Sequence, residues 1–221
     1  MTNIKENIEI LTKQVKELSF DIKPTIVAVS KQQSYLKIIE AFNAGQRVFG
    51  ENYLQEAMDK QKDLKDYPIE WHFIGPIQSN KCKLIAENFD WVQTVDRMKI
   101  ARRLDESCSG KIINICIQIN ISEEPTKSGI MPNQVDTFAK ELSQFKYLNL
   151  RGIMAIPSQN KTDGNLKHEL VLLKKIFVNL KNQNNNIDTL SVGMSNDYKL
   201  ALNYGSTMIR VGSHIFGARA K

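Results

Sequence analysis

Cysteine and long apolar runs are both scarce in this sequence. The 221 residues include three cysteines, Cys82, Cys108 and Cys116, and no C-x-x-C motif. An odd number of cysteines at this spacing indicates neither a disulfide framework nor a zinc site, and no other cluster suggests a metal. No apolar run approaches the roughly 18 residues of a membrane span, and the N-terminus lacks the apolar core of a signal peptide. We therefore expect a cytoplasmic protein with reduced thiols, no metal and no membrane partner.

Glycine, proline and clustered charge are also limited. The sequence has 11 glycines and 6 prolines, and 42% of its residues are hydrophobic and 24% charged, which excludes collagen-like and low-complexity proteins. Thirty Lys and Arg against 24 Asp and Glu give a formal charge of +6. That excess suits a protein that handles anions, but the basic residues are scattered, whereas nucleic-acid-binding proteins usually gather them on one face. We expect no nucleic-acid partner.

Short apolar runs alternate with segments of helical periodicity along the chain. The predicted strands are Thr25–Ser30, Arg47–Gly50, Glu70–Ile74, Trp91–Val95, Lys111–Ile119, Leu150–Ile156, Thr189–Val192 and Thr207–Val211. The predicted helices between them are Tyr35–Ala44, Tyr53–Lys65, Lys81–Glu87, Arg97–Ser107, Asn133–Gln144, Lys167–Lys181 and Asp197–Tyr204. Alternation of this kind is typical of parallel strands joined by right-handed crossovers, and eight such units close a (β/α)8 TIM barrel. An open doubly wound sheet is the alternative.

An additional helix is predicted before the first strand. Its apolar residues recur at helical spacing, and they are Ile4, Ile8, Leu11, Val15 and Leu18. Asn3 is placed to cap it. We expect residues 1–20 to pack as a helix on the barrel, and residues 1–221 to form one domain, since no low-complexity linker divides the chain. A monomer is expected, although the same apolar face could pair two copies.

The functional groups of such a barrel gather at the C-terminal ends of its strands. Lys31 follows the first strand, and strand alternation places it on the same face as Val27 and Val29, toward the barrel interior. A lysine there can meet a ligand in a partly desolvated mouth. A lysine at a strand end is by default a solvated surface charge, so Lys31 is a candidate because of its place in the barrel.

The loops after the seventh and eighth strands form a candidate phosphate site. Barrels frequently bind phosphate with these two loops, using backbone N–H groups near a helix start. Ser195 lies in the first loop, and Gly212 and Ser213 lie in the second, where Gly212 allows a close backbone approach that a side chain would obstruct. Ser195 could instead cap a helix, and Gly212 could merely permit a turn. Both loops falling at this end of the barrel favours phosphate.

Arg210 shares a strand face with Gly212, two residues further on. An arginine that points into a barrel interior is costly unless it meets an anion or a strong acceptor. On spacing alone, an internal ion pair with Glu51 or another acid explains Arg210 as well as a ligand does. His72 is a weaker candidate that we place in the barrel interior.

Several segments, taken in order, match one family. They are Val27–Lys31, Phe49–Tyr53, Trp71–Lys81, Gln118–Ile121, Lys127–Gly129, Arg151–Ile156, Gly193–Ser195, Gly205–Gly212 and Ile215–Arg219. Together they resemble the pyridoxal phosphate homeostasis protein family from Thr25 to Arg219. The combination is highly specific, whereas each short segment alone would be weak.

The resemblance implies a protein that binds pyridoxal 5′-phosphate (PLP) on the barrel of the alanine racemase N-terminal domain. Lys31 matches the family lysine that forms an internal aldimine with PLP. Arg210 matches the arginine that faces the pyridine nitrogen, and Asn52 matches a residue near the ring. The phosphate loop of the family corresponds to Ser195, Gly212 and Ser213.

Two positions depart from the family pattern. His214 stands where a Gly-Thr-Ala pattern places alanine, and it adds bulk and possible charge next to Ser213. Asn196 stands where the family often has an acid. These departures affect the details of the phosphate contacts rather than the choice of cofactor.

The expected function is PLP homeostasis without robust catalysis, with PLP-dependent apo-enzymes as possible recipients. A guanidinium cannot accept a proton, so Arg210 leaves the pyridine nitrogen unprotonated and weakens the ring as an electron sink. The alternative is a small PLP-dependent racemase that uses Tyr53, Tyr204 or His72 as its second acid/base. Racemisation needs proton donors on both faces of the substrate, and only Lys31 is an obvious one. Alanine racemases add a second domain that supplies a tyrosine, and we expect none here. A barrel enzyme that takes another phosphorylated substrate is a third hypothesis.

Overall fold

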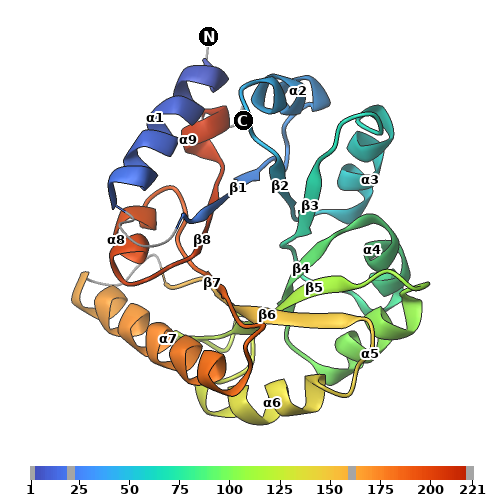
Figure 1. Cartoon of the computed structure of the whole chain (residues 1–221), viewed down its shortest axis with the longest axis vertical. Helices are drawn as coiled ribbons and strands as arrows, with labels where there is room; N and C mark the ends of the chain where they lie inside the picture. Colours follow the sequence, from blue (N-terminus) through green and yellow to red (C-terminus); the bar gives the residue numbers. More distant parts are fainter. Residues whose placement is uncertain (1–2, 19–22, 159–162, 218–221) are drawn as a thin grey trace.

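The chain folds into a closed barrel of eight parallel strands, each strand paired with the next in sequence order (Figure 1). The computed structural model describes residues 3–18, 23–158 and 163–217. The strands are β1 Thr25–Val29, β2 Val48–Glu51, β3 Glu70–Phe73, β4 Trp91–Val95, β5 Ile113–Ile119, β6 Leu148–Ala155, β7 Thr189–Ser191 and β8 Met208–Val211. The ring closes because β1 pairs with β8, with Val27 opposite Arg210. The predicted TIM barrel is confirmed, and the open sheet is wrong.

Most helices follow the strands as predicted. They are α2 Tyr35–Asn43, α3 Leu54–Asp63, α4 Cys82–Asn88, α5 Met98–Ser107, α6 Val135–Leu142, α7 Asp163–Gln183 and α8 Tyr198–Asn203. Two predicted helices begin as short 3-10 helices, η1 Ser79–Lys81 and η2 Pro132–Gln134, and the helix α9 Ser213–Phe216 was not predicted. An element of four residues is too short to show a periodic pattern, which is why the sequence gives no sign of α9.

Two strands begin two residues away from their predicted starts: β5 begins later than expected, and β6 begins earlier. The register of β6 against β5 shifts between Ile115 and Cys116. Gly152 follows this irregularity with a φ of 158°, and a Cβ there would lie 1.7 Å from the carbonyl oxygen of Thr189. A glycine is required at this point because the backbones of β6 and β7 approach so closely.

The N-terminal helix α1, Ile4–Leu18, packs against α2, α8 and α9 beside β1 (Figure 1). Its buried residues are Ile4, Ile8, Leu11 and Val15. The side-chain oxygen of Asn3 accepts a hydrogen bond from the Glu6 N–H at 3.1 Å, so the predicted cap is present. The apolar face that could have paired two copies is therefore covered by this chain's own helices. Residues 1, 2, 19 and 20 of the predicted helix lie outside the described residues.

The barrel has two separate apolar regions. The larger lies between the strands and the surrounding helices, and the smaller fills the barrel interior with Val27, Trp91, Cys116, Met154 and Met208. Val27 thus faces inward, as strand alternation predicted. All three cysteines are buried and free. Within the described part of the chain, no helix is long and apolar enough to cross a bilayer, and no group of His, Cys, Asp and Glu is arranged to hold a metal.

Candidate functional site

A cavity of about 620 Å³ opens at the C-terminal ends of the strands. Its lining includes all six residues singled out in the sequence, which are Lys31, Asn52, Ser195, Arg210, Gly212 and Ser213. Lys31 and Arg210 are far apart in the sequence, but the pairing of β1 with β8 places them on adjacent strands. The closed barrel is thus what brings the candidate residues together.

Lys31 is half-buried and lies two residues after Val29, the last residue of β1. The N–H of Ser30, just before it, donates to the carbonyl oxygen of Gly50 at 3.0 Å, which extends the contact between the first two strands. Val29 and Lys31 both line the cavity, as their shared face predicted. The amine therefore belongs to the barrel mouth rather than to the outer surface.

Arg210 is buried, with 4% of its surface exposed. Its Nη1 donates to the carbonyl oxygen of Ser191 at 2.8 Å and to the Ser191 hydroxyl at 2.7 Å, and its Nη2 donates to the carbonyl oxygen of Ala155 at 2.9 Å. Burial lowers the pKa of Arg210 to about 10, and the Asp197 carboxylate opposes that shift. The guanidinium stays charged at neutral pH and is held by neutral acceptors.

The ion pair between Arg210 and Glu51 is wrong. A Cβ on Gly50 would lie 2.8 Å from a methyl of Val27 in the barrel interior, so Gly50 faces inward and Glu51 faces the helices. There Glu51 meets Lys60 of α3, with 2.8 Å between the Lys60 amine and a carboxylate oxygen. Arg210 and Glu51 therefore lie on opposite sides of the barrel wall.

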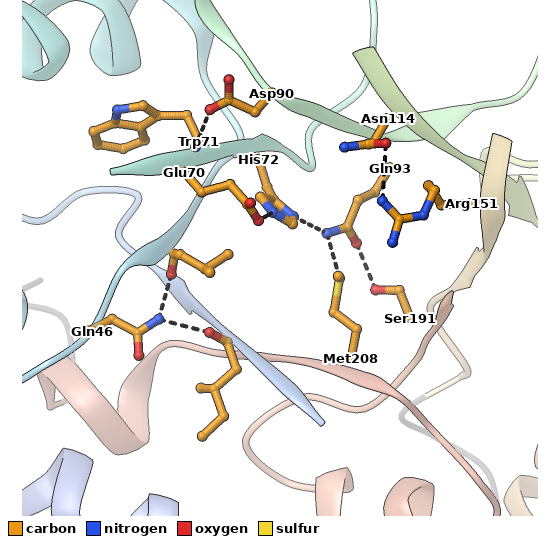
Figure 2. Close-up of polar contacts among 12 residues, drawn as sticks. Gln46, Glu70, Trp71, His72, Asp90, Gln93, Asn114, Arg151, Ser191 and Met208 are labelled. Carbon is orange, nitrogen blue, oxygen red and sulfur yellow. Dashed lines mark hydrogen bonds and ion pairs between the residues drawn. The ribbon is translucent and has the colours of Figure 1, made fainter. Parts of the chain in front are cut away.

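A chain of hydrogen bonds runs from Arg210 through the barrel interior, and Figure 2 shows its members from Ser191 to Glu70. The Ser191 hydroxyl contacts Oε1 of Gln93 at 2.6 Å. Nε2 of Gln93 contacts Nδ1 of His72 at 2.7 Å, and Nε2 of His72 contacts Oε1 of Glu70 at 2.7 Å. The chain links the cavity to Glu70, where β3 begins at the opposite end of the barrel.

Arginine fixes the direction of this chain. A guanidinium can only donate, so the Ser191 hydroxyl accepts from Arg210 and must donate its own proton to Gln93. Gln93 then presents its amide N–H to His72, which accepts at Nδ1 and carries its proton on Nε2, facing Glu70. Burial lowers the pKa of His72, against the effect of Glu70, so the imidazole is neutral at pH 7.

The racemase alternative named three acid/base candidates, and the structure places none of them in the lining of the cavity. Among the described residues that line the cavity, none is Tyr53, Tyr204 or His72. His72 is in the interior as predicted, but both of its ring nitrogens are already hydrogen-bonded. Tyr53 is 52% exposed and stands at the start of α3.

The loop after β7 is folded back on itself. The Met194 N–H donates to the Asp197 carboxylate at 2.6 Å, and the N–H of Tyr198 donates to the Met194 carbonyl oxygen at 2.9 Å. The helix α8 begins at Tyr198 with Asp197 at its cap position. Ser195 lies two residues before that cap, so the explanation that Ser195 merely caps a helix is wrong.

The loop after β8 approaches β1 closely. Gly212 has a φ of −113°, which any residue adopts, so the turn itself does not require glycine. A Cβ at Gly212 would lie 3.2 Å from the carbonyl oxygen of Val29, which is tighter than most side chains allow. Ser213 then opens α9, and the first N–H groups of a helix have no acceptor within it. His214 is exposed and meets Tyr198 edge-to-face at 5.8 Å, so it does not extend the cavity.

Asn52 carries an unusual feature for a half-buried side chain. Its Oδ1 is buried and has no hydrogen-bond partner among the described residues. A Cβ on Gly75 would lie 2.0 Å from the Asn52 carbonyl oxygen, so the segment that follows β3 packs directly against this residue. Buried acceptors are nearly always paired in native proteins. A donor from a ligand in the cavity would satisfy Oδ1.

Three residues were missed in the sequence: Ser191 and Ala155, which accept from Arg210, and Gln93, which accepts from the Ser191 hydroxyl. Ser191 and Gln93 have a readable signal, because each is a polar residue at an inward position of a strand. Gln93 lies two residues after Trp91, which is in the interior cluster. The carbonyl of Ala155 has no such signal, since any residue provides one.

Comparison with known proteins agrees with this geometry. A family model described as the alanine racemase N-terminal domain matches residues 1–220. The class of protein is therefore a barrel of the alanine racemase N-terminal type. The chain is also 45% identical over 225 residues to the pyridoxal phosphate homeostasis protein of Pasteurella multocida, covering 99% of this chain and 96% of that protein. The chain belongs to the alanine racemase N-terminal domain family and, within it, to the pyridoxal phosphate homeostasis proteins.

Two solved structures place the barrel in context. PipY of Synechococcus elongatus PCC7942, solved with PLP bound, superposes with a TM-score of 0.86 at 34% identity and covers 97% of this chain and 100% of that one. Alanine racemase of Clostridium difficile 630 gives a TM-score of 0.78 at 14% identity, with 99% of this chain and 57% of that one covered. The second likeness shows the fold alone. The resemblance read from the sequence is confirmed.

Proposed function

We propose that this chain binds PLP in the cavity at the barrel mouth and serves in PLP homeostasis rather than as an enzyme. The observation that carries the proposal is that Lys31 lines the same cavity as the loops after β7 and β8. An amine and an anion-binding backbone within one cavity match the aldehyde and the phosphate of PLP. The PLP-bound structure of PipY and the names of the relatives support the choice of cofactor.

The donors around the cavity suit the parts of PLP in turn. Lys31 supplies the amine that holds the aldehyde as a Schiff base, the internal aldimine, with loss of water. Ser195, Gly212 and Ser213 supply hydroxyls and backbone N–H groups for the phosphate. Asn52 has an unpaired acceptor and lines the same cavity, where it would face the ring. Asp197 also lines the cavity, but its carboxylate is engaged by the Met194 N–H.

The same side chains argue against efficient catalysis. PLP, when bound, supplies an aldehyde that condenses with amines and a pyridine ring that can withdraw electrons. Such withdrawal is strongest when an acid keeps the ring nitrogen protonated. Arg210 has a pKa of about 10 and is a charged donor at neutral pH. It therefore does not provide the acidic side chain that would keep the ring nitrogen protonated. The proposal is that the site holds PLP and passes it to apo-enzymes.

The proposal also covers the oligomeric state, the cellular location and the extent of the domain. We propose that the chain acts as a monomer in the cytoplasm, since the apolar face of α1 is covered within one copy. We propose that residues 1–221 form one PLP-binding unit. A measurement of molar mass in solution by light scattering tests the monomer, and a mass of two chains would refute it.

The proposed function is tested by adding PLP to the purified protein and following its absorbance. A Schiff base band is expected at one equivalent, and none is expected with pyridoxine 5′-phosphate, which lacks the aldehyde. The absence of a band with PLP would refute the binding proposal. The PLP-loaded protein is then incubated with L-alanine in D2O, and α-proton exchange over many turnovers would instead establish a racemase.

A further inference from the structure

Side chains of α3 hold the backbone on both sides of Lys31. The Lys60 amine donates to the carbonyl oxygen of Ser30 at 2.7 Å, and the Glu56 carboxylate accepts the N–H of Gln32 at 2.5 Å. Glu56 and Lys60 lie one helical turn apart and are paired with each other at 2.6 Å. The side chains of this ion pair therefore hydrogen-bond to the backbone of Ser30, before Lys31, and of Gln32, after it.

Glu51 fixes this ion pair to the barrel wall. The Lys60 amine lies 2.8 Å from the Glu51 carboxylate, which also accepts the Ser30 hydroxyl at 2.7 Å. The side chain of Glu51 is fully buried and that of Lys60 is 8% exposed. Lys60 has three N–H donors, and Ser30, Glu51 and Glu56 supply three acceptors for them. All three donors of the Lys60 amine are therefore used, and the contact is largely buried, unlike a surface ion pair.

Gln32 stands in a conformation that needs support. Its φ is 60°, in the left-handed region that residues other than glycine seldom adopt. Strained backbone of this kind persists only where surrounding contacts determine it. The hydrogen bond from the Gln32 N–H to Glu56 is such a contact, and it sets the path of the chain as it leaves Lys31.

We propose that Glu56 and Lys60 are positioning residues for Lys31, holding its turn in the shape that presents the amine to the cavity. The inference rests on the proposed function, because it gives Lys31 the role of binding the PLP aldehyde. Neither Glu56 nor Lys60 is among the described residues that line the cavity, so their effect passes through the backbone. A turn that is ordered beforehand does not have to be ordered when the ligand binds.

The test compares PLP binding by Glu56→Ala with that by Asp59→Ala. Asp59 is a matched control, because it is an acid on the same helix that pairs with Lys62 on the surface and does not touch the turn. We expect the affinity for PLP, followed by the Schiff base band, to fall about fivefold to tenfold in Glu56→Ala, the loss of one well-placed hydrogen bond. Asp59→Ala is expected to stay within about twofold of the parent.

A second change separates positioning from a general loss of structure. Glycine adopts a φ of 60° without steric strain, so adding Gln32→Gly to Glu56→Ala should regain at least half of the lost affinity on a logarithmic scale. Pyridoxal 5′-phosphate binding that is not regained would contradict a role through the turn. Where Glu56→Ala fails to fold, Glu56→Gln keeps the side-chain length and is expected to lose about threefold.

The outcomes distinguish this inference from the proposed function. If the parent and Asp59→Ala form no Schiff base with PLP, the proposed function fails. If they do form it and folded Glu56→Ala or Glu56→Gln binds PLP as the parent does, the proposed function stands and the positioning role is overturned. A selective loss with rescue by Gln32→Gly supports both.

Discussion

Arg210 donates to the hydroxyl of Ser191 at 2.7 Å, and this contact sets the direction of a hydrogen-bond chain that crosses the whole barrel. Because arginine has no acceptor, each later member of the chain has one possible role. The guanidinium at the cavity is therefore tied to a neutral imidazole in the interior. Both ends of the chain can be tested.

Ser191→Ala should lower the free energy of unfolding by about 1–3 kcal/mol. The change leaves Oε1 of Gln93 buried without its donor and removes one of the three acceptors of Arg210. Urea unfolding measures the loss. Ser107→Ala is the control, because that hydroxyl contacts its own helix on the surface, and it should stay within about 0.5 kcal/mol of the parent. Equal losses in the two variants would refute the hydrogen-bond chain through Ser191.

His72→Asn should remove part of the pH dependence of stability. Burial lowers the pKa of His72 below its ordinary value of 6.5. As the pH falls below 6.5, the unfolded chain takes up a proton at this ring that the folded chain does not. Stability from His72 is thus present above the unfolded pKa and is lost as the pH falls toward the folded pKa.

The free energy of unfolding, measured from pH 7 to pH 5, gives the slope for the parent and the variant. One such group contributes at most about 1.4 kcal/mol per pH unit, and His72→Asn should lack that contribution. His168→Asn is the control, because His168 is exposed on α7. A slope in His72→Asn that equals the slope of the parent would show that the buried ring does not resist protonation.

Ser195→Ala should weaken the binding of PLP more than that of pyridoxal, which has the aldehyde but no phosphate. A hydrogen bond to a charged group is worth about 1.5–3 kcal/mol, so the affinity for PLP should fall by about 10-fold to 100-fold. Absorbance titrations with the two aldehydes measure both losses. If the two affinities fall equally, Ser195 does not contact the phosphate.

The sequence predicts the barrel and the position of its site because both follow from strand alternation. Val29 and Lys31 share a face, and so do Arg210 and Gly212, so closing the barrel brings these four residues to one cavity. Val27, on the same face as Val29, lies in the interior cluster. The same rule, applied to Gly50 and Glu51, would have turned Glu51 away from Arg210. The predicted pairing of Arg210 with Glu51 is wrong because spacing along the chain does not show which face of a strand a side chain occupies.

Other contacts depend on how helices dock, which the sequence does not determine by itself. The contact of Lys60 with Ser30 requires α3 to lie against the end of β1, and no periodic pattern specifies that distance. The conformation of Gln32 is likewise unreadable, because no glycine or asparagine marks its left-handed backbone. The helix α9 has four residues, which are too few for a periodic pattern that would predict it.

The central claim is that the Lys31 amine binds the aldehyde of PLP. The most direct measurement is reduction of the PLP-loaded protein with borohydride, followed by peptide mapping for the modified lysine. Lys37→Ala serves as the control, because Lys37 is a nearby lysine on α2 whose amine contacts Gln33. The account predicts a modified peptide at Lys31 in the parent and in Lys37→Ala, and none in Lys31→Ala. An undiminished adduct in Lys31→Ala, or a label mapped to another lysine in the parent, would contradict it.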